Sequence, residues 1–155
     1  METSPGVKKS VLKRIGMSCV NFNIKRLSRE VSLQYDRALS PLGIRGTQYS
    51  LLITAAYYEN PSMNEAAAAL GMDRTTLTKN LKPMLEKGFL SLESGSDRRQ
   101  KKLSITDAGR DLLERAIPLW EKVQNDVINQ IGKQELKSLL RISAAMESSD
   151  RSGVR

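Results

Sequence analysis

The most informative part of this sequence is residues 62–106, which read SMNEAAAALGMDRTTLTKNLKPMLEKGFLSLESGSDRRQKKLSIT. Ser62 and Glu65 have the spacing of a capping box, in which each side chain satisfies a backbone N–H of the other residue. The helix that they would start is almost pure alanine, and it should end at Gly71 because glycine commonly follows the last turn of a helix. Its small side chains would let another helix pack closely.

A second helix is expected after a short turn. Asp73 is a favourable N-cap, and apolar residues then recur at helical spacing up to Lys87: Leu77, Leu81, Met84 and Leu85. The opposite face carries Thr75, Thr76, Lys79 and Lys82. Two helices joined by a short turn, the second polar on its outer face, describe a helix-turn-helix. Pro83 predicts a kink in the second helix because it removes a backbone hydrogen bond.

Two strands are predicted directly after this helix. Residues 89–93 and 101–105 have strand character, and they flank a turn rich in Ser, Gly and Arg. Alternation along the second strand predicts Leu103 and Ile105 facing inward, and Lys102 and Ser104 facing outward. Residues 74–102 contain eight Lys/Arg and three acidic residues, so the positive charge of the chain is concentrated on this segment.

The whole chain has 155 residues, 39% of them hydrophobic, and a formal net charge of +8. This length suits one domain with a single core. A basic balance favours a polyanionic partner, and nucleic acid is the leading candidate because contacts to phosphate release condensed counterions. No signal peptide is recognisable, and no run approaches the roughly 18 apolar residues of a membrane-spanning helix. We expect a soluble, cytoplasmic protein without a membrane partner.

The sequence argues against an enzyme. It has no histidine, which removes the commonest general base and the commonest zinc ligand, and neither glycine-rich phosphate-binding motif occurs. Ser10 and Lys13 have a Ser-x-x-Lys spacing, but the companion motifs of that catalytic group are absent. A single cysteine, Cys19, excludes multi-cysteine metal sites and fits a reducing compartment. We predict no catalytic residue, no metal and no cofactor.

Long helices are predicted on both sides of the central segment. An apolar stripe predicts one over about 11–40, and Thr47 is the expected N-cap of another that ends near Tyr58. The latter should bury Tyr49, Leu52, Ile53 and Ala56. Thr106 should cap a helix over residues 107–131, and a last helix should follow, with a disordered tail from Ser148. These stripes exceed what a small domain can cover, so a partner surface is expected.

The chain resembles the MarR family of winged helix-turn-helix transcription regulators. The resemblance extends from about Cys19 to the end of the chain. It rests on GMDRTTLTKNL, on EKGFL, and on the patterns Asp97-x-Arg99, Leu103-x-Ile105-Thr106 and Asp107-x-Gly109. It implies a mainly α fold with a small β-wing (α+β) in one domain over residues 1–155. The winged helix-turn-helix would occupy about 47–106, and dimerisation helices about 11–40 and 107–147.

The resemblance also implies the DNA contacts. Arg74, Thr75, Thr76 and Lys79, with Lys82 on the same face, would meet the major groove. Arg99, held by Asp97, would enter the minor groove, and Arg98 and Lys101 would lie near phosphate. A homodimer would place its two recognition helices one turn of double-stranded DNA apart, roughly 34 Å, on an inverted-repeat operator. The resemblance therefore implies a repressor that dissociates from its operator when a small molecule binds.

The resemblance implies two ways in which DNA binding could be regulated. Small phenolic or anionic ligands bind between the dimerisation helices and the winged domain, where Tyr35, Arg45, Tyr49 and Trp120 are candidates, although packing alone explains these residues equally well. Some relatives sense peroxide through a cysteine of the first helix, which makes Cys19 a candidate redox site. The sensing pattern, however, has a cysteine where this chain has Asn21 and a tyrosine where it has Gly46.

Other interpretations remain open at the level of sequence. Exposed basic loops are usually only solvated, and a basic winged protein can coat DNA without sequence choice. A winged fold can also belong to an enzyme, because a fold does not decide a function. A regulator that selects its operator should bind it at least roughly 10³-fold more tightly than random DNA.

Overall fold

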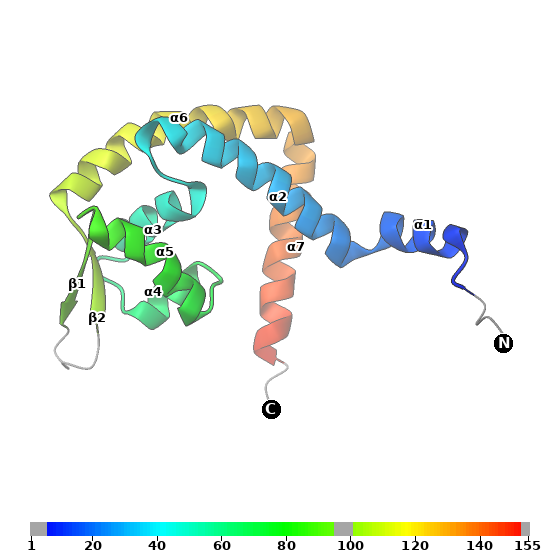
Figure 1. The fold of residues 1–155 in the computed structure, drawn as a ribbon, viewed down its shortest axis with the longest axis horizontal. Coiled ribbons are helices and arrows are strands. Elements are labelled where there is room, and N and C mark those ends of the chain that lie inside the picture. The colour runs from blue at the N-terminus through cyan, green and yellow to red at the C-terminus, as the bar shows by residue number, and fades with distance from the viewer. Residues whose placement is uncertain (1–5, 95–100, 153–155) are drawn as a thin grey trace.

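The structure, a computed structural model, describes residues 6–94 and 101–152. Its elements follow one another in a fixed order: α1 Lys9–Ser18, α2 Val20–Leu39, the 3-10 turn η1 Ser40–Leu42, α3 Gly46–Tyr57, α4 Met63–Ala69, α5 Arg74–Glu86, β1 Leu90–Ser94, β2 Lys101–Ile105, α6 Asp107–Ile131 and α7 Lys133–Ser152. The fold is mainly α with one small antiparallel sheet, as predicted. Helices α3, α4 and α5 and the sheet form a lobe, above which α2 and α6 run side by side (Figure 1).

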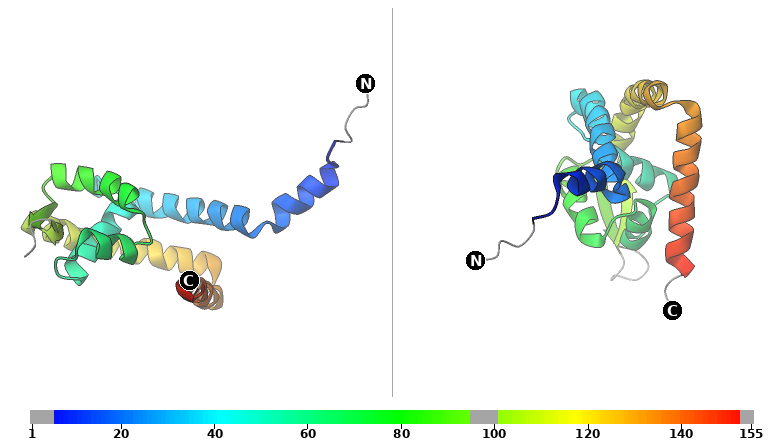
Figure 2. Two further views of the ribbon diagram at one scale, coloured as in Figure 1. Left: turned by 90° about the horizontal axis from the view of Figure 1, so that it is seen from below. Right: turned by 90° about the vertical axis from the view of Figure 1, so that its right-hand side faces the viewer.

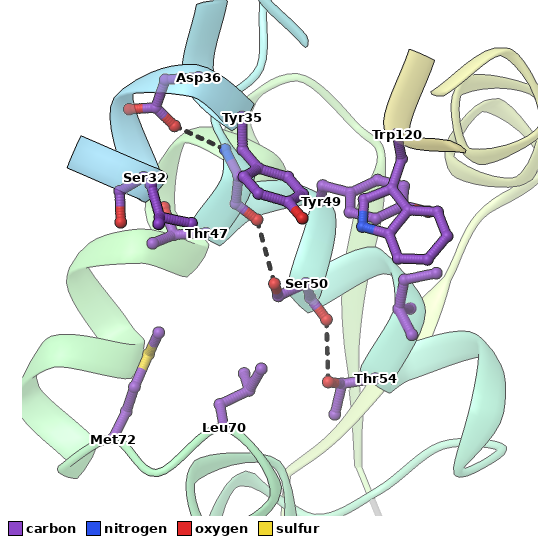
Figure 3. A pocket seen from close by; sticks show the side chains of 13 residues that line it. Ser32, Tyr35, Asp36, Thr47, Tyr49, Ser50, Thr54, Leu70, Met72 and Trp120 are labelled. Atoms are coloured by element: carbon purple, nitrogen blue, oxygen red, sulfur yellow. Dashed lines mark hydrogen bonds between the residues drawn. The ribbon is translucent and has the colours of Figure 1, made fainter. Parts of the chain in front are cut away.

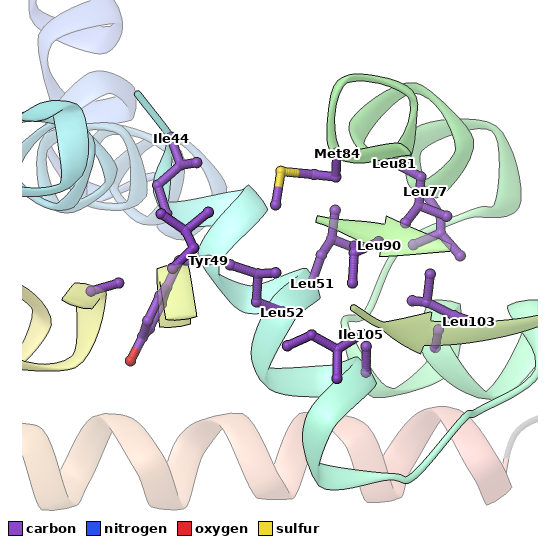
Figure 4. Packing of buried hydrophobic residues seen from close by; sticks show 14 of the residues in the cluster. Ile44, Tyr49, Leu51, Leu52, Leu77, Leu81, Met84, Leu90, Leu103 and Ile105 are labelled. Atoms are coloured by element: carbon purple, nitrogen blue, oxygen red, sulfur yellow. The ribbon is translucent and has the colours of Figure 1, made fainter. Parts of the chain in front are cut away.

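The core of the lobe surrounds α3, which packs against α4, α5, α6 and β2. Leucine side chains from several elements meet there with less than 2% of their surface exposed (Figure 4): Leu51, Leu52, Leu77, Leu81 and Leu103. Ala66 of α4 is also fully buried, as expected where two helices pack closely. The predicted burial on α3 was wrong at Ile53, which is 38% exposed, whereas Leu51 and Ala55 are buried.

The caps of the helix-turn-helix are those that the sequence predicts. Ser62 Oγ accepts a hydrogen bond from the Glu65 N–H at 3.2 Å, and Glu65 Oε2 accepts one from the Ser62 N–H at 2.8 Å. Asp73 Oδ1 accepts a bond from the Thr76 N–H at 2.8 Å. Gly71 takes the left-handed conformation, φ 60°, between the two helices. Helix α5 continues through Pro83 to Glu86.

The two-stranded sheet pairs Leu90 with Ile105 at its base. The edge of β2 that faces away from β1 pairs with the residues before α4. The Leu103 N–H donates to the Pro61 carbonyl at 2.8 Å, and Ser62 pairs with Lys102. The prediction that Ser104 faces out was wrong, since only 5% of this residue is exposed. Both α3 and α4 pack against β2, so an outward-facing position at the base of this strand is not open to solvent.

The start of α6 is locked against the base of the sheet. Thr106 Oγ1 accepts a bond from the Gly109 N–H at 3.0 Å and lies 2.6 Å from the Gly88 carbonyl, to which it donates. A Cβ atom at Gly109 would lie 2.0 Å from the Phe89 carbonyl oxygen. Glycine is therefore required at this position by close approach of the two backbones.

The predicted first helix is interrupted. Cys19 has extended backbone angles, φ −68° and ψ 109°, which separate α1 from α2. The Asn23 side chain donates to the Met17 carbonyl in the last turn of α1 at 3.3 Å and to the Cys19 carbonyl at 2.9 Å, so it bridges the break between the two helices. The disordered tail expected from Ser148 was wrong, because α7 remains helical through Ser152.

Helices α1 and α7 extend from the body of the molecule (Figures 1 and 2). Large apolar side chains on these helices and on the first half of α2 are exposed by 47% or more: Leu12, Ile15, Met17, Val20, Phe22, Ile24, Leu27, Leu139, Leu140, Ile142 and Met146. Apolar stripes of this extent are unusual on the surface of a soluble monomer.

Candidate nucleic-acid interface and ligand pocket

The outer face of α5 carries exposed polar and basic side chains. Arg74, Thr75 and Lys79 are exposed, as predicted from the helical period. Thr76 is exposed too, but its hydroxyl donates to Asp73 Oδ2 at 2.8 Å, so this side chain takes part in the N-cap. Lys82 lies 3.8 Å from Glu86 on the next turn, an exposed pair that contributes little stability. Arg74, Thr75 and Lys79 are consequently the side chains best placed to bind an external partner.

The sheet also carries an exposed basic side chain. It follows α5 directly and packs beside it, and Lys101 at the start of β2 is exposed. The predicted contacts Asp97, Arg98 and Arg99 lie outside the described residues. The described part of the interface is therefore the α5 face together with Lys101.

A pocket of about 770 Å³ lies between the lobe and the long helices (Figure 3). It is lined from α2, α3, the α4–α5 turn and α6 by Val31, Ser32, Tyr35, Asp36, Gly46, Thr47, Tyr49, Ser50, Ile53, Thr54, Leu70, Met72 and Trp120. The rings of Tyr49 and Trp120 stack with their centroids 6.4 Å apart. Concave, mostly apolar sites with a few convergent polar groups are the usual form of small-molecule sites.

Both tyrosines of the pocket are held in the neutral form. Burial raises the pKa of Tyr35, whose hydroxyl donates to Gln124 Oε1. Burial, and secondarily the negative charge of Glu121, raises the pKa of Tyr49. A tyrosine of ordinary pKa is already protonated at neutral pH, and the raised pKa values act in the same direction, so both side chains present a hydroxyl and an aromatic face rather than a charge.

Asp36 fixes one wall of the pocket. Its Oδ1 accepts a hydrogen bond from the Gly46 N–H at 2.8 Å, at the N-terminus of α3. The prediction that Thr47 caps this helix was wrong: Arg45 is the N-cap residue, and the Gln48 side chain accepts its N–H at 2.9 Å. Asp36 was not predicted from the sequence, because it lies ten residues from the helix that it caps and no local pattern indicates the contact.

Comparison with known proteins gives the family. No family model matches the chain. The transcriptional regulator MosR of M. tuberculosis, solved in complex with DNA, is 34% identical, and the match covers 85% of this chain and 98% of MosR with a TM-score of 0.75. The chain belongs to the MarR family of transcriptional regulators.

More distant structures share the fold. An E. coli MarR mutant complexed with operator DNA is 18% identical, covering 85% of this chain and 96% of that chain, with a TM-score of 0.76. BpsR of Bordetella bronchiseptica, whose DNA binding is regulated by 6-hydroxynicotinic acid, is 16% identical, covering 83% and 93% respectively, with a TM-score of 0.73. These matches confirm the MarR winged-helix architecture expected from the sequence.

Not every residue suggested by the MarR resemblance lies in the pocket. Tyr35, Tyr49 and Trp120 do, but Arg45 instead lines an adjoining hollow with Asp36, Lys79 and Asn80. The N-cap position of Arg45, with its extended backbone at φ −105°, places it at the entry to α3 rather than on the face that lines the pocket. Asp36 belongs to both hollows, so one carboxylate lies between the pocket and α5.

Cys19, the candidate redox site that the MarR resemblance suggests, is partly buried at the break between α1 and α2. Within residues 6–94 and 101–152 no group of acidic, cysteine or histidine side chains has the geometry of a metal site. The same residues contain no helix that is long and apolar enough to span a membrane.

Proposed function

We propose that this protein is a homodimeric repressor that binds an inverted-repeat operator and is released by a small molecule bound in the pocket. The observation that carries the DNA-binding part is the solvent-facing side of α5, where Arg74, Thr75 and Lys79 project from a doubly capped helix-turn-helix. MosR, a relative of more than 30% identity over nearly its whole length, was solved on DNA. We assign α5 to the major groove, and Arg99 with Asp97 to the minor groove.

Dimerisation is supported by the unpartnered apolar stripes. Residues such as Leu12, Phe22 and Leu140 are more than half exposed on helices that extend from the body. Burying an exposed leucine gains about 1.5–3 kcal/mol, so a second copy that covers these stripes would be strongly stabilised. We propose that α1, α2, α6 and α7 form the dimer interface.

Regulation by a ligand is supported by the position of the pocket. It joins α2 and α6, on the dimerisation side, to α3 and to the turn before α5. A ligand that binds more tightly to the conformation with one particular separation of these elements would increase the population of that conformation. The distance between the two α5 helices of the dimer would change with it.

Footprinting on the DNA that flanks the gene of this protein tests the proposal. The expected result is protection of an inverted repeat, with competition by random DNA at least roughly 10³-fold weaker. Arg99→Ala and Lys79→Ala should weaken operator binding without changing the mass of the dimer, whereas Lys122→Ala, which removes a positive charge from α6, should not. Absence of a protected inverted repeat at moderate salt would refute specific binding and favour an architectural protein.

A further inference from the structure

The chemistry of the pocket is specific enough to suggest the charge of its ligand. Among the described residues that line it, Asp36 is the only ionisable side chain besides the two tyrosines, and none is Lys or Arg. The walls are aromatic and aliphatic, with Tyr35, Tyr49 and Trp120 on one side and Leu70 and Met72 on the other (Figure 3). The pocket thus combines one carboxylate with three aromatic rings.

The Asp36 carboxylate is not paired with a basic side chain of the described residues. Its hydrogen bond comes from the neutral Gly46 N–H, and within the described residues no Lys or Arg forms an ion pair with it. Arg45 and Lys79 share the adjoining hollow with Asp36 but do not line the pocket. A second acid, Glu121, is close enough to Tyr49 to raise the pKa of that phenol.

The N-terminus of α3 does not reverse this balance. Helix N-termini attract anions through their free N–H groups, and Gly46 begins α3 at this wall. Asp36 already accepts the Gly46 N–H, so it occupies that position as an internal anion. An anionic ligand would have to approach or displace a carboxylate, with no basic group in the pocket to offset the repulsion.

We propose that this pocket binds a flat aromatic cation, with its positive group directed to Asp36 and its ring among Tyr35, Tyr49 and Trp120. Cations are attracted to the faces of aromatic rings, and a charge-assisted hydrogen bond to a carboxylate is about twice as strong as a neutral one. This assignment rests on the proposed function, in which the pocket is the effector site. It replaces the phenolic or anionic ligand that the family resemblance suggests.

Three probes of nearly the same shape test the charge directly: benzamidinium, benzamide and benzoate. Trp120 is the only tryptophan in the chain, so quenching of its fluorescence reports binding at the pocket. Benzamidinium should bind roughly tenfold more tightly than benzamide, and benzoate should bind most weakly. Benzoate binding as tightly as benzamidinium, or no quenching by benzamidinium, would overturn the assignment.

A pair of variants locates the effect. Asp36→Asn retains an oxygen that can accept the Gly46 N–H but removes the charge, so the preference for benzamidinium over benzamide should disappear. Asp111→Asn removes a charge from an exposed position on α6 and should leave the preference intact. If Asp36→Asn loses its helical circular dichroism, the comparison of the three probes on the native protein still decides the charge.

Release of operator DNA, measured with the same three probes, separates this inference from the proposed function. If benzamidinium binds but the DNA is retained, the effector role of the pocket fails and the ligand class holds. If benzoate binds better and releases the DNA, the ligand class fails and the effector role holds.

Discussion

The ammonium group of Lys87 donates a hydrogen bond to the backbone carbonyl of Gly43 at 3.1 Å. Lys87 is the C-cap residue of α5, and Gly43 ends the turn that follows α2 in a left-handed conformation, φ 67°. The two residues are 44 positions apart in the sequence, so this bond joins the end of α5 to the turn that follows the long helix α2. It is a polar link between the helix assigned to DNA and the turn that leads out of a helix assigned to the dimer.

Replacing Lys87 by methionine should loosen that link with little loss of global stability. An exposed hydrogen bond contributes about 1 kcal/mol or less, but its loss frees the segment before α3. Hydrogen exchange of the amides in residues 40–46 should accelerate. Lys82→Met is the matched control, because Lys82 pairs with Glu86 on its own helix; equal acceleration in both variants would contradict the link.

Gly109 provides a test of the close approach between α6 and the sheet. In Gly109→Ala the new Cβ would lie 2.0 Å from the Phe89 carbonyl oxygen and 2.8 Å from Ile105 Cγ1. Overpacking of this kind costs about 1–3 kcal/mol, and contact with rigid backbone places this variant at the upper end. Urea unfolding should show the loss.

Gly16→Ala is the control for that variant. Gly16 lies inside α1, and no neighbouring atom lies within 4 Å of a Cβ added there. Alanine should leave stability unchanged or raise it slightly, because glycine in a helix is unfavourable by about 1 kcal/mol relative to alanine. Similar losses in both variants would show that the effect at Gly109 is not steric.

The caps of the helix-turn-helix predict how its stability depends on pH. The Ser62 N–H lowers the pKa of Glu65, and the Thr76 N–H lowers the pKa of Asp73, from ordinary values of 4.5 and 3.8. Because the folded pKa values are depressed, the stabilisation is fully present above those ordinary values. It is lost as the pH falls through the folded values.

Unfolding in urea at a series of pH values from about 7 down to about 3 checks this dependence. The double variant Glu65→Gln, Asp73→Asn keeps capping side chains without titrating groups, so its stability should fall less steeply in acid. If the stability of the double variant falls as steeply in acid as that of the native protein, these two carboxylates are excluded as the source of the pH dependence.

The central segment was predictable because its signals are local. A capping box, an N-cap and an apolar period each involve residues within a few turns of one another, and they gave α4, α5 and the bounds of α6 correctly. Gly109 in the family pattern also has a physical cause, the backbone of Phe89.

The features that the sequence analysis missed depend on contacts between distant segments. The cap of α3 comes from Asp36 on another helix, and Ser104 is buried on a strand against which both α3 and α4 pack. The break at Cys19 is a change in one backbone angle, which a hydrophobic period running past it does not reveal. Propensity and spacing carry no information on such contacts.

The exposed stripe of α7 gives the most direct test of the dimer. Leu140 is 61% exposed, and it shares this helix with Ile142 and Met146, which are exposed as well. If a second copy covers these residues, Leu140→Glu would bury a carboxylate without a partner, which costs several kcal/mol. Sedimentation velocity should then show the mass of a monomer. Operator affinity should fall, because a monomer contacts one half-site whereas a dimer contacts both. Gln134→Glu, an equal change of charge at an exposed polar position of α7, should remain a dimer. A Leu140→Glu protein that sediments as the native one does would place the interface elsewhere, and the apolar stripe of α7 would then need another partner.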